Sequence, residues 1–395
     1  MKIGRIFGIP IYLHLTFLII LPLFVWVFSS ESLRIFGITL GFEGLDTTMA
    51  VEYAFGTAAA VIFFATILAH ELAHSYVAIR YGVTIRSITL MLFGGVASME
   101  EMPRKPGQEL KMALAGPMTS LAIGLVSYVA MIFVRELAIG TVAAEGLEIL
   151  LGIIAFYNVL LAGFNLIPAF PMDGGRMLRS FLATRMSNID ATRRAASVAK
   201  VLAAAMGVFG IVFGNIFLIF IAFFVYMGAK EEEQATVITE SLEGFTVRQL
   251  MNENVQTVHP NISVQQMMDT MMATRMMGFP VVDQGLLVGI VTLTDTDKVP
   301  KERAGMTMVR DIMSRSVVTV RPNLPASDAI KLISKRNVGR LPVVDDSGAL
   351  VGIVTRKDFL RMVEIMEARR KGATWGPPEW HLQHERRQHP PPPQT

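Results

Sequence analysis

The chain has 395 residues, of which 52% are hydrophobic and only 17% charged. Soluble domains average about 25% charged residues, so much of this chain is expected to lie in a membrane. The net charge of +3 gives no basis for nucleic-acid binding, and the absence of cysteine excludes disulfides and thiolate metal ligands. Any bound metal must therefore be held by histidine and carboxylate side chains.

Five uncharged apolar stretches predict that residues 1–230 form a polytopic α-helical membrane domain. They run over residues 6–30, 53–69, 112–134, 149–172 and 201–229. Because about 20 apolar residues cross the hydrocarbon core, each of the first four predicts one helix, and the second is expected to continue to Ile79. The fifth stretch fits either one long span or, if it starts at Ala195, two short helices that turn at Gly214-Asn215.

The basic residues of the loops predict how these spans are oriented. Residues 30–52 and 135–148 contain one basic residue each, whereas the loops after the second and fourth stretches are rich in arginine and lysine. The positive-inside rule therefore places the N-terminus and these two basic loops in the cytosol of a multi-pass cell-membrane protein. If the fifth stretch makes two spans, the C-terminal half is cytosolic as well.

The second apolar stretch leads into His70-Glu71-Leu72-Ala73-His74. Histidines four residues apart lie on one face of a helix, about one turn apart, so both can bind the same metal. Glu71 lies nearby without being needed as a ligand, which suits a general base acting on metal-bound water. Burying these groups in an apolar helix is costly unless they are paired or bound to metal. The alternative is a solvated helix end at the membrane interface.

Asp173 is the candidate for a third ligand, because a catalytic zinc usually has three protein ligands and a water. It lies in residues 165–176 (NLIPAFPMDGGR), after the fourth stretch. The second and fourth spans run in the same direction, so Asp173 and His70 are expected at similar depth near the cytosolic side. The two prolines break the helix, and the two glycines are expected to permit unusual backbone angles. The alternative is that Asp173 caps the next helix.

These two motifs resemble those of the site-2 protease family, and the resemblance covers about residues 1–230. It includes Ala115-Gly116-Pro117 in the third stretch. The resemblance implies six spans and an intramembrane metalloprotease with one zinc ion per chain. Zinc held by the two histidines and Asp173 would activate water, and Glu71 would take its proton and pass it to the leaving amine. The substrate would be a transmembrane helix of another protein, which must unwind locally before cleavage.

Two further features are candidates for substrate contact. Asn165 lies about two helical turns before Asp173 and on roughly the same face. It is expected either to hydrogen-bond the substrate backbone or the developing oxyanion, or to tie two helices together. Residues 84–99 are mostly apolar and predict a hairpin that dips into the membrane beside the site. Its exposed edge would pair with the unwound substrate, although a packed loop without substrate contact fits equally well.

From about Lys230 the chain becomes charged, and an internal repeat follows with an offset of 62 to 63 residues. Residues 247–251 (VRQLM), 279–283 (FPVVD) and 287–292 (LVGIVT) recur as 309–313 (VRDIM), 341–345 (LPVVD) and 350–355 (LVGIVT). Each unit predicts strand, helix, strand, hairpin, strand and helix. The units resemble a tandem pair of CBS domains, a soluble α/β module, at residues 246–300 and 307–366. Residues 367–395 are basic and end in a proline run, so they are expected to be a disordered tail.

The CBS resemblance implies a cleft for an adenine nucleotide such as ATP or AMP, which would regulate the enzyme. Thr292 with Asp295, and Thr355 with Asp358, match the phosphate- and ribose-binding pattern of that family. A carboxylate can accept both ribose hydroxyl hydrogens, but the same pattern also caps a following helix. A homo-oligomer formed through the CBS domains is a further expectation.

Two other functions compete with a protease. One is a nucleotide-sensing transporter or channel, and the other is a membrane sensor that binds the metal without proteolysis. The spans show neither an inverted repeat nor a line of charged residues through the membrane, and this favours the protease over the transporter.

Overall fold

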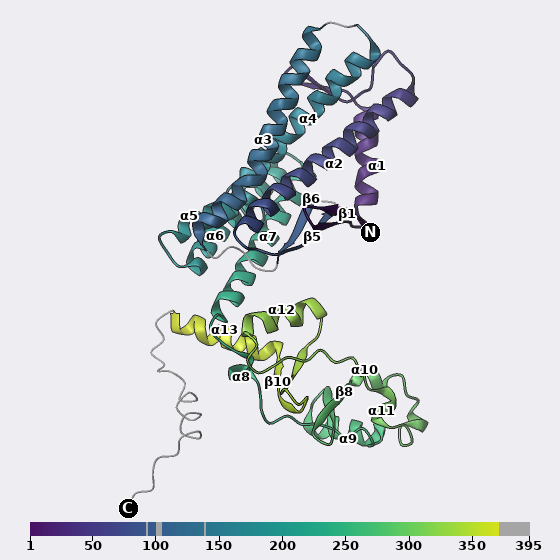
Figure 1. Cartoon of the computed structure of the whole chain (residues 1–395), viewed down its shortest axis with the longest axis vertical. Helices are drawn as coiled ribbons and strands as arrows, with labels where there is room; N and C mark the ends of the chain where they lie inside the picture. The colour runs from purple at the N-terminus through teal and green to yellow at the C-terminus, as the bar shows by residue number, and fades with distance from the viewer. Residues whose placement is uncertain (92–93, 100–104, 138–139, 371–395) are drawn as a thin grey trace, which may run out of the picture. The chain divides into compact units, whose positions relative to one another are not determined.

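The computed structural model describes residues 1–91, 94–99, 105–137 and 140–370. The chain divides into two compact units, and the boundary along the sequence lies between Gln234 and Ala235. The first is called the membrane unit and the second the CBS unit. Their elements are coloured from purple to yellow along the chain in Figure 1. The membrane unit is helical, with two small sheets among its described residues, and the CBS unit is α/β, as predicted.

The described part of the membrane unit contains the beginnings of seven helices: α1 Phe17–Ser30, α2 Met49–Arg80, α3 Pro106–Glu136, α4 Val142–Leu166, α5 Asp173–Ala183, α6 Asn188–Val212 and α7 Ile216–Ser241. Among the described residues, α2, α3, α4 and α6 are long and apolar enough to cross a membrane. α1 has 14 residues, so it is about 21 Å long, whereas the hydrocarbon core is about 30 Å thick. Six spans therefore stay a prediction.

The first apolar stretch, residues 6–30, was expected to form one helix, and this prediction is wrong. Strand β1 Lys2–Ile6 ends where the stretch begins, residues 9–13 of the stretch form strand β2 Ile9–Leu13, and helix α1 begins only at Phe17. The apolar side chains of β2 are buried against a second hairpin and α2, so their hydropathy reflects packing in a sheet. The fifth stretch forms two helices, α6 and α7, joined at Gly214, whose φ is +63°.

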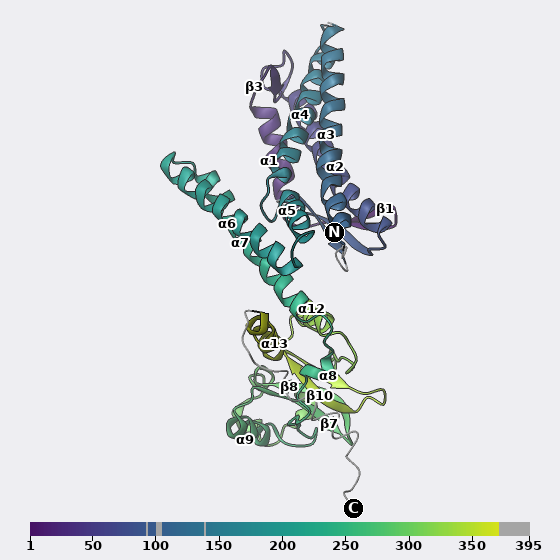
Figure 2. The ribbon, with the colours of Figure 1, turned by 90° about the vertical axis from the view of Figure 1, so that its left-hand side faces the viewer.

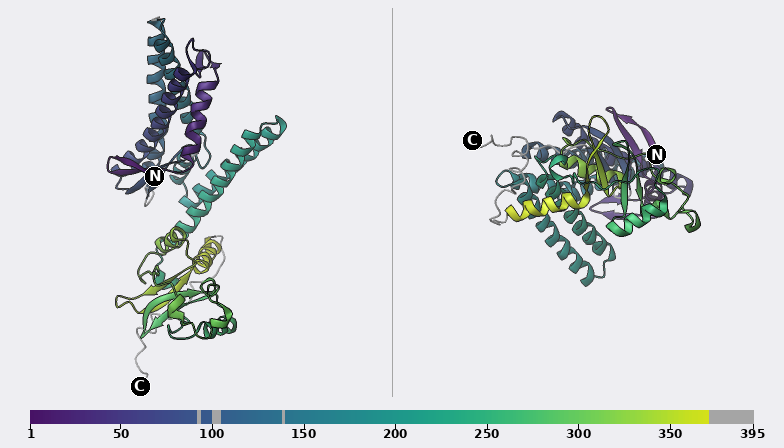
Figure 3. Two further views of the ribbon diagram at one scale, coloured as in Figure 1. Left: turned by 90° about the vertical axis from the view of Figure 1, so that its right-hand side faces the viewer. Right: turned by 90° about the horizontal axis from the view of Figure 1, so that it is seen from below.

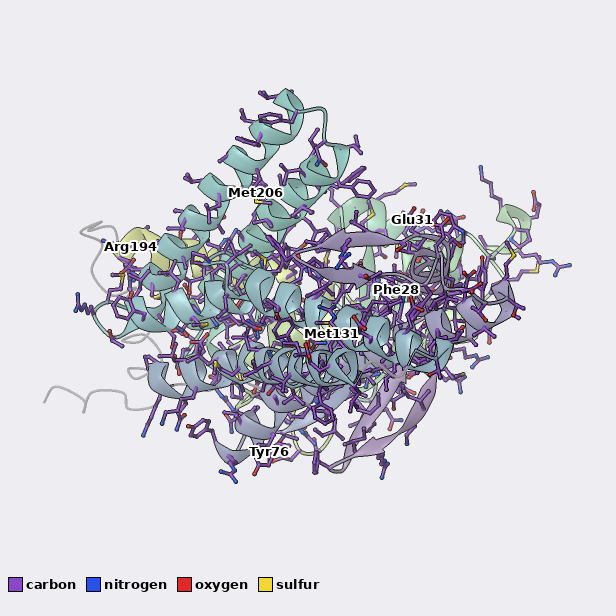
Figure 4. The ribbon with its side chains drawn as sticks, turned by 90° about the horizontal axis from the view of Figure 1, so that it is seen from above. Phe28, Glu31, Tyr76, Met131, Arg194 and Met206 are labelled. Carbon is purple, nitrogen blue, oxygen red and sulfur yellow. The ribbon has the colours of Figure 1, made fainter. Side chains whose placement is uncertain are left out.

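The α6–α7 hairpin diverges from the bundle of α1 to α4, as Figures 2 and 3 show. Viewed from above, Met206 lies on this hairpin, whereas Phe28 and Met131 lie in the bundle (Figure 4). Phe28 and Met131 are buried, but many large apolar side chains of the hairpin are exposed, including Phe217. Such a surface suits lipid and would be unfavourable in water.

The four-stranded sheet of the membrane unit has the order β1-β2-β5-β6, with β5 Ile85–Met91 and β6 Gly94–Met99. β5 and β6 form the predicted hairpin, and β5 pairs in parallel with β2. Buried isoleucines of β2 and β5 pack against Leu68 and Leu72 of α2. The sheet is thereby fixed beside the histidine motif, with β6 at its edge. A separate hairpin is formed by β3 Leu33–Ile35 and β4 Ile38–Leu40.

The CBS unit consists of two similar halves. Its elements are α8 Val247–Leu250, α9 Val264–Thr274, β7 Gly278–Asp283, β8 Leu286–Thr292, α10 Leu293–Thr296, a 3-10 turn at Lys301–Arg303, α11 Val309–Ile312, α12 Ala326–Arg336, β9 Arg340–Val344, β10 Leu350–Thr355 and α13 Arg356–Arg370. The expected first strand of each repeat is reduced to one parallel bridge, Val258 to Val281 and Val320 to Val343. The disordered tail was expected from residue 367, but residues 367–370 are the end of α13, and residues 371–395 lie outside the described residues.

The two repeats exchange their first segments. Val247 at the start of α8 is buried in the core that contains β9, β10 and α12 of the second repeat. Val309 of α11 is buried in the core that contains α9, β7 and β8 of the first repeat. Each hydrophobic core is therefore completed by residues of the other repeat, so the two halves are expected to fold together.

Candidate metal centre

The three predicted metal ligands converge on one point between α2 and the start of α5. The Nε2 atoms of His70 and His74 lie 3.1 Å apart. Oδ2 of Asp173 lies 3.3 Å from the first and 3.0 Å from the second. Tetrahedral ligands at zinc distances of about 2.1 Å stand roughly 3.4 Å apart, so these atoms have the spacing of a zinc site. The two histidines are buried and Asp173 is half-buried.

The other ring nitrogen of each histidine is held by α3. Nδ1 of His74 lies 2.7 Å from the carbonyl oxygen of Met112, and Nδ1 of His70 lies 2.9 Å from Oγ of Ser120. A carbonyl can only accept a hydrogen bond, so Nδ1 of His74 donates, and its neutral ring presents a lone pair at Nε2. Such partners orient metal-binding histidines and make them better ligands.

Two glycines leave the space around these side chains open. A Cβ atom on Gly116 of α3 would stand 2.2 Å from Nε2 of His74 and 2.5 Å from Nε2 of His70. The α3 backbone therefore borders the space that both nitrogens face. A side chain at position 116 would occupy the place of a metal. A Cβ atom on Gly95 would stand 2.3 Å from Cγ of Glu71. The backbone of β6 thus lies directly against the predicted general base.

Asp173 reaches the histidines because the chain folds tightly between α4 and α5. α4 ends at Leu166, because Pro168 disfavours helical backbone angles at the residue before it, Ile167. A Cβ atom on Gly174 would stand 2.3 Å from the carbonyl oxygen of Ile167, and Gly175 lies as tightly against the same loop. Both glycines have helical backbone within α5. The prediction that they supply unusual angles is wrong; they are needed for close approach.

The charge on Asp173 suits a metal ligand. Burial alone would raise the pKa of Asp173, but its close contacts with the rings of His70 and His74 and the nearby Arg176 hold that pKa below its ordinary value. The side chain is therefore ionised at neutral pH, which is the form of a carboxylate that binds metal.

Asn165, the predicted substrate contact, uses its side-chain amide within its own helix. Nδ2 donates to the carbonyl oxygen of Leu161, one turn earlier on α4, at 2.9 Å. The role of tying two helices together is taken instead by Asn158, which the sequence analysis did not single out. Asn158 is fully buried, and its Nδ2 donates to Oγ1 of Thr66 on α2 at 3.1 Å. A signal was available, because an amide within an apolar span marks an intramembrane contact.

The two predicted nucleotide contacts of the CBS unit form helix caps. Oδ2 of Asp295 accepts from N and Oγ1 of Thr292 at 2.9 and 2.7 Å. Oδ2 of Asp358 accepts from the same atoms of Thr355, both at 2.7 Å. The alternative of a helix cap therefore describes what the structure contains, and the nucleotide contact stays a prediction.

Comparison with known proteins assigns both halves of the chain. Residues 58–209 match the model of peptidase family M50, and residues 247–298 and 309–365 each match the model of the CBS domain. A zinc metalloprotease of Methanocaldococcus jannaschii is 34% identical over 367 residues, which cover 93% of this chain and 96% of that protein.

Two further matches each cover part of this chain. The solved site-2 protease from Methanocaldococcus jannaschii shares 37% identity over 59% of this chain and 94% of that chain, with a TM-score of 0.40. A CBS domain-containing protein of Bacillus subtilis is 37% identical over 118 residues, which cover 29% of this chain and 82% of that protein.

Proposed function

The chain belongs to peptidase family M50 as a site-2 protease-like zinc metalloendopeptidase with C-terminal CBS domains, and from this we propose that it hydrolyses a peptide bond within or near a transmembrane segment of a protein substrate. One observation carries the proposal. The three donor atoms of His70, His74 and Asp173 converge at a buried position, and the histidines lie on a helix apolar enough to cross a membrane. Family membership also favours this function over a transporter or a sensor without proteolysis.

The residues of the site fit zinc, both in donor type and in spacing. Zinc bound by His70, His74 and Asp173 would supply the positive charge that acidifies a water and polarises the scissile carbonyl. Glu71 is adjacent to one ligand in sequence and lies against β6, so it is placed to accept a proton at its carboxylate. The same carboxyl group would then deliver that proton to the nitrogen of the leaving amine.

We propose that the substrate backbone pairs with the edge of β6. Among the described strands, β6 is paired on one side only, with β5. An edge strand offers backbone groups to an extended peptide, and an unwound transmembrane segment needs such partners inside a membrane. Because Gly95 of β6 lies against Glu71, a peptide on this edge would pass close to the general base. Asn165 stays a candidate for the oxyanion or backbone contact.

The proposed orientation follows the loop charges: the N-terminus, the metal site and the CBS unit would all lie toward the cytosol. We propose that an adenine nucleotide binds the CBS pair near Thr292, Asp295, Thr355 and Asp358 and changes the cleavage rate. A homo-oligomer assembled through the same domains is proposed as well. Membership in the CBS family supports the nucleotide proposal. Equal cleavage rates with and without ATP, at concentrations where ATP binding is measured, would contradict nucleotide control.

Glu71→Gln tests the proteolytic function. The purified chain in lipid vesicles is given a substrate with one transmembrane segment, and zinc content is measured in parallel. Loss of the general base is expected to lower the cleavage rate about 10²- to 10⁴-fold while zinc is retained. Glu52→Gln makes the same change near the other end of α2 and should cleave normally. Unchanged cleavage by Glu71→Gln would contradict the mechanism, and zinc without cleavage in the unaltered chain would favour the sensor.

A further inference from the structure

A buried ion cluster connects the helix that begins with Asp173 to the helix that leads into the CBS unit. Arg179 lies on α5, six residues after Asp173, and only 6% of its side chain is exposed. Its guanidinium contacts Glu109 at the start of α3, with Nε 2.9 Å from Oε1. Its Nη1 also donates to Oε1 of Glu232 on α7 at 2.8 Å. One buried cation therefore joins α3, α5 and α7.

The charge on Arg179 is secured by these two carboxylates. Burial alone would lower the pKa of Arg179, but Glu109 and Glu232 raise it above its ordinary value. A buried charge of this kind is strongly destabilised when one partner is removed, because the remaining charge has lost its compensation. The position of α5 is therefore expected to depend on Glu232, which α7 supplies.

α7 also packs directly on the loop that precedes Asp173. Val225 and Ala229 of α7 are buried in one cluster with Ala169, Phe170 and Met172 of that loop, together with four alanines of α6. A Cβ atom on Gly228 would stand 2.8 Å from Cδ of Pro171. The α7 backbone thus rests directly on the ring of Pro171.

These contacts share one face of α7, because Val225, Ala229 and Glu232 are spaced by four and three residues. The next residue of α7, Glu233, forms a second ion pair: its Oε2 lies 2.5 Å from Nζ of Lys200 on α6. α7 continues without a break to Ser241, so its last residues belong to the CBS unit. A shift or rotation of this helix would therefore reach both the loop and α5. Figure 2 shows α5 beside the α6–α7 hairpin.

We propose that Arg179 is a positioning residue for the metal ligand Asp173, and that Glu232 makes this position depend on α7 and hence on the state of the CBS unit. The proposal rests on the proposed function, since it gives the regulatory nucleotide a physical route to the metal site. Arg179 does not contact the substrate or the metal in this scheme. It acts by holding α5, and through α5 the carboxylate of Asp173, against the two histidines.

The test compares Glu232→Gln with Glu231→Gln in the full-length chain. Both variants remove one negative charge from α7, but Glu231 is exposed, whereas Glu232 pairs with Arg179. The rate of zinc release to a chelator is measured together with cleavage. Glu232→Gln is expected to release zinc at least about 5-fold faster than the unaltered chain, within the range of coupling between linked sites. Glu231→Gln should stay within about 2-fold.

Arg179→Lys is a second variant, in case Glu232→Gln fails to fold. It keeps the charge but loses the planar fork that contacts two carboxylates, so faster zinc release is again expected. Zinc release that matches the unaltered chain in every variant that folds would overturn the positioning role. A chain that releases zinc as expected but cleaves no substrate would contradict the proposed function and leave the positioning role standing.

The connection to the CBS unit is tested by adding ATP. ATP is expected to change the zinc-release rate of the unaltered chain and of Glu231→Gln by the same factor, and to change that of Glu232→Gln by much less. If ATP binds but zinc release stays the same in the unaltered chain, the route through α7 is wrong. If ATP does not bind at all, the nucleotide proposal fails instead, and the comparison of the two glutamates still decides the role of Arg179.

Discussion

The membrane unit and the CBS unit both bury apolar side chains, but they differ in how many polar side chains they bury. Among the described residues, every buried polar or charged side chain except Thr296 lies in the membrane unit. They include both histidines of the metal site, Arg179 and Asn158, while large apolar side chains are exposed on the same helices. In the CBS unit the cores are formed by residues such as Ile333 and Phe279, which are fully buried.

The difference follows from the solvent of each unit. Lipid tails are as apolar as leucine, so a membrane helix gains little by burying apolar groups, and its polar groups must find partners inside. A buried polar residue in the membrane unit is therefore a candidate for a functional or connecting role. In the CBS unit the burial of apolar side chains is itself favourable, because it removes them from water. The polar contacts of this unit are found at helix ends near the surface. Changes in the two units should accordingly separate zinc binding from stability.

The largest expected effect is that of Gly116→Ala in the membrane unit. The added Cβ atom would stand 2.2 Å from Nε2 of His74, in the space that the ligand atoms face. Zinc affinity is expected to fall by about 100-fold or more, at the upper end of what changes around metal ligands cause. Equilibrium dialysis against a zinc buffer measures the loss, and cleavage should disappear with the metal.

Gly107→Ala is the matched control for Gly116→Ala. It makes the same change on α3, at a position where a Cβ atom would meet nothing within 4 Å. Its zinc affinity should equal that of the unaltered chain. If Gly116→Ala also bound zinc normally, the metal would have to lie away from the space between α3 and the two histidines.

The sequence predicted the residues of this centre better than the way they are held. His70, His74 and Asp173 are chemically specific residue types at diagnostic spacings, so the sequence analysis could name them. Gly116 appeared only as part of a motif, because its closeness to the histidines depends on how α3 crosses α2. The same applies to Arg179, which counted as one basic loop residue and is in fact buried between two carboxylates.

The fold was predicted where hydropathy and length agree, and was not predicted where they diverge. α2 has 32 residues and ends at Arg80, one residue after the predicted end. The strand β2 was expected to be part of a span, because a short apolar run cannot by itself distinguish a buried strand from a helix. The first strand of each CBS repeat was predicted longer than the single bridge that forms, since tertiary pairing decides how far a strand extends.

Ser120→Ala should have a smaller effect on the same site. It removes the hydroxyl that lies 2.9 Å from Nδ1 of His70 but leaves all three metal ligands in place. Zinc affinity is expected to fall by about 10-fold, the lower end for loss of a partner that orients a metal-binding histidine. Ser127→Ala is the control, because Ser127 is buried on the same helix two turns further on. Equal zinc affinities for both variants would mean that Met112 and helix packing suffice to orient the histidines.

The smallest expected effect lies in the CBS unit. Asp358→Ala removes the carboxylate that accepts hydrogen bonds from N and Oγ1 of Thr355 at the start of α13. Loss of a helix cap costs about 1 kcal/mol, so the unfolding midpoint of the CBS unit should fall by a few degrees. Zinc affinity should not change, because none of the metal-site residues lies in this unit. Calorimetric unfolding and zinc titration of the full chain give both values.

The same variant distinguishes a cap from a nucleotide site. If Asp358 only caps α13, the ATP affinity of Asp358→Ala should fall no more than the lost stability requires. The control is Asp328→Ala, which removes an exposed carboxylate from α12. Under the same assumption the two variants should bind ATP equally tightly. If Asp358 also binds ribose, ATP affinity should fall about 10-fold or more, because a hydrogen bond to a charged group contributes about 1.5–3 kcal/mol. That result would give the CBS unit a polar site at its surface, where the membrane unit has one in its interior.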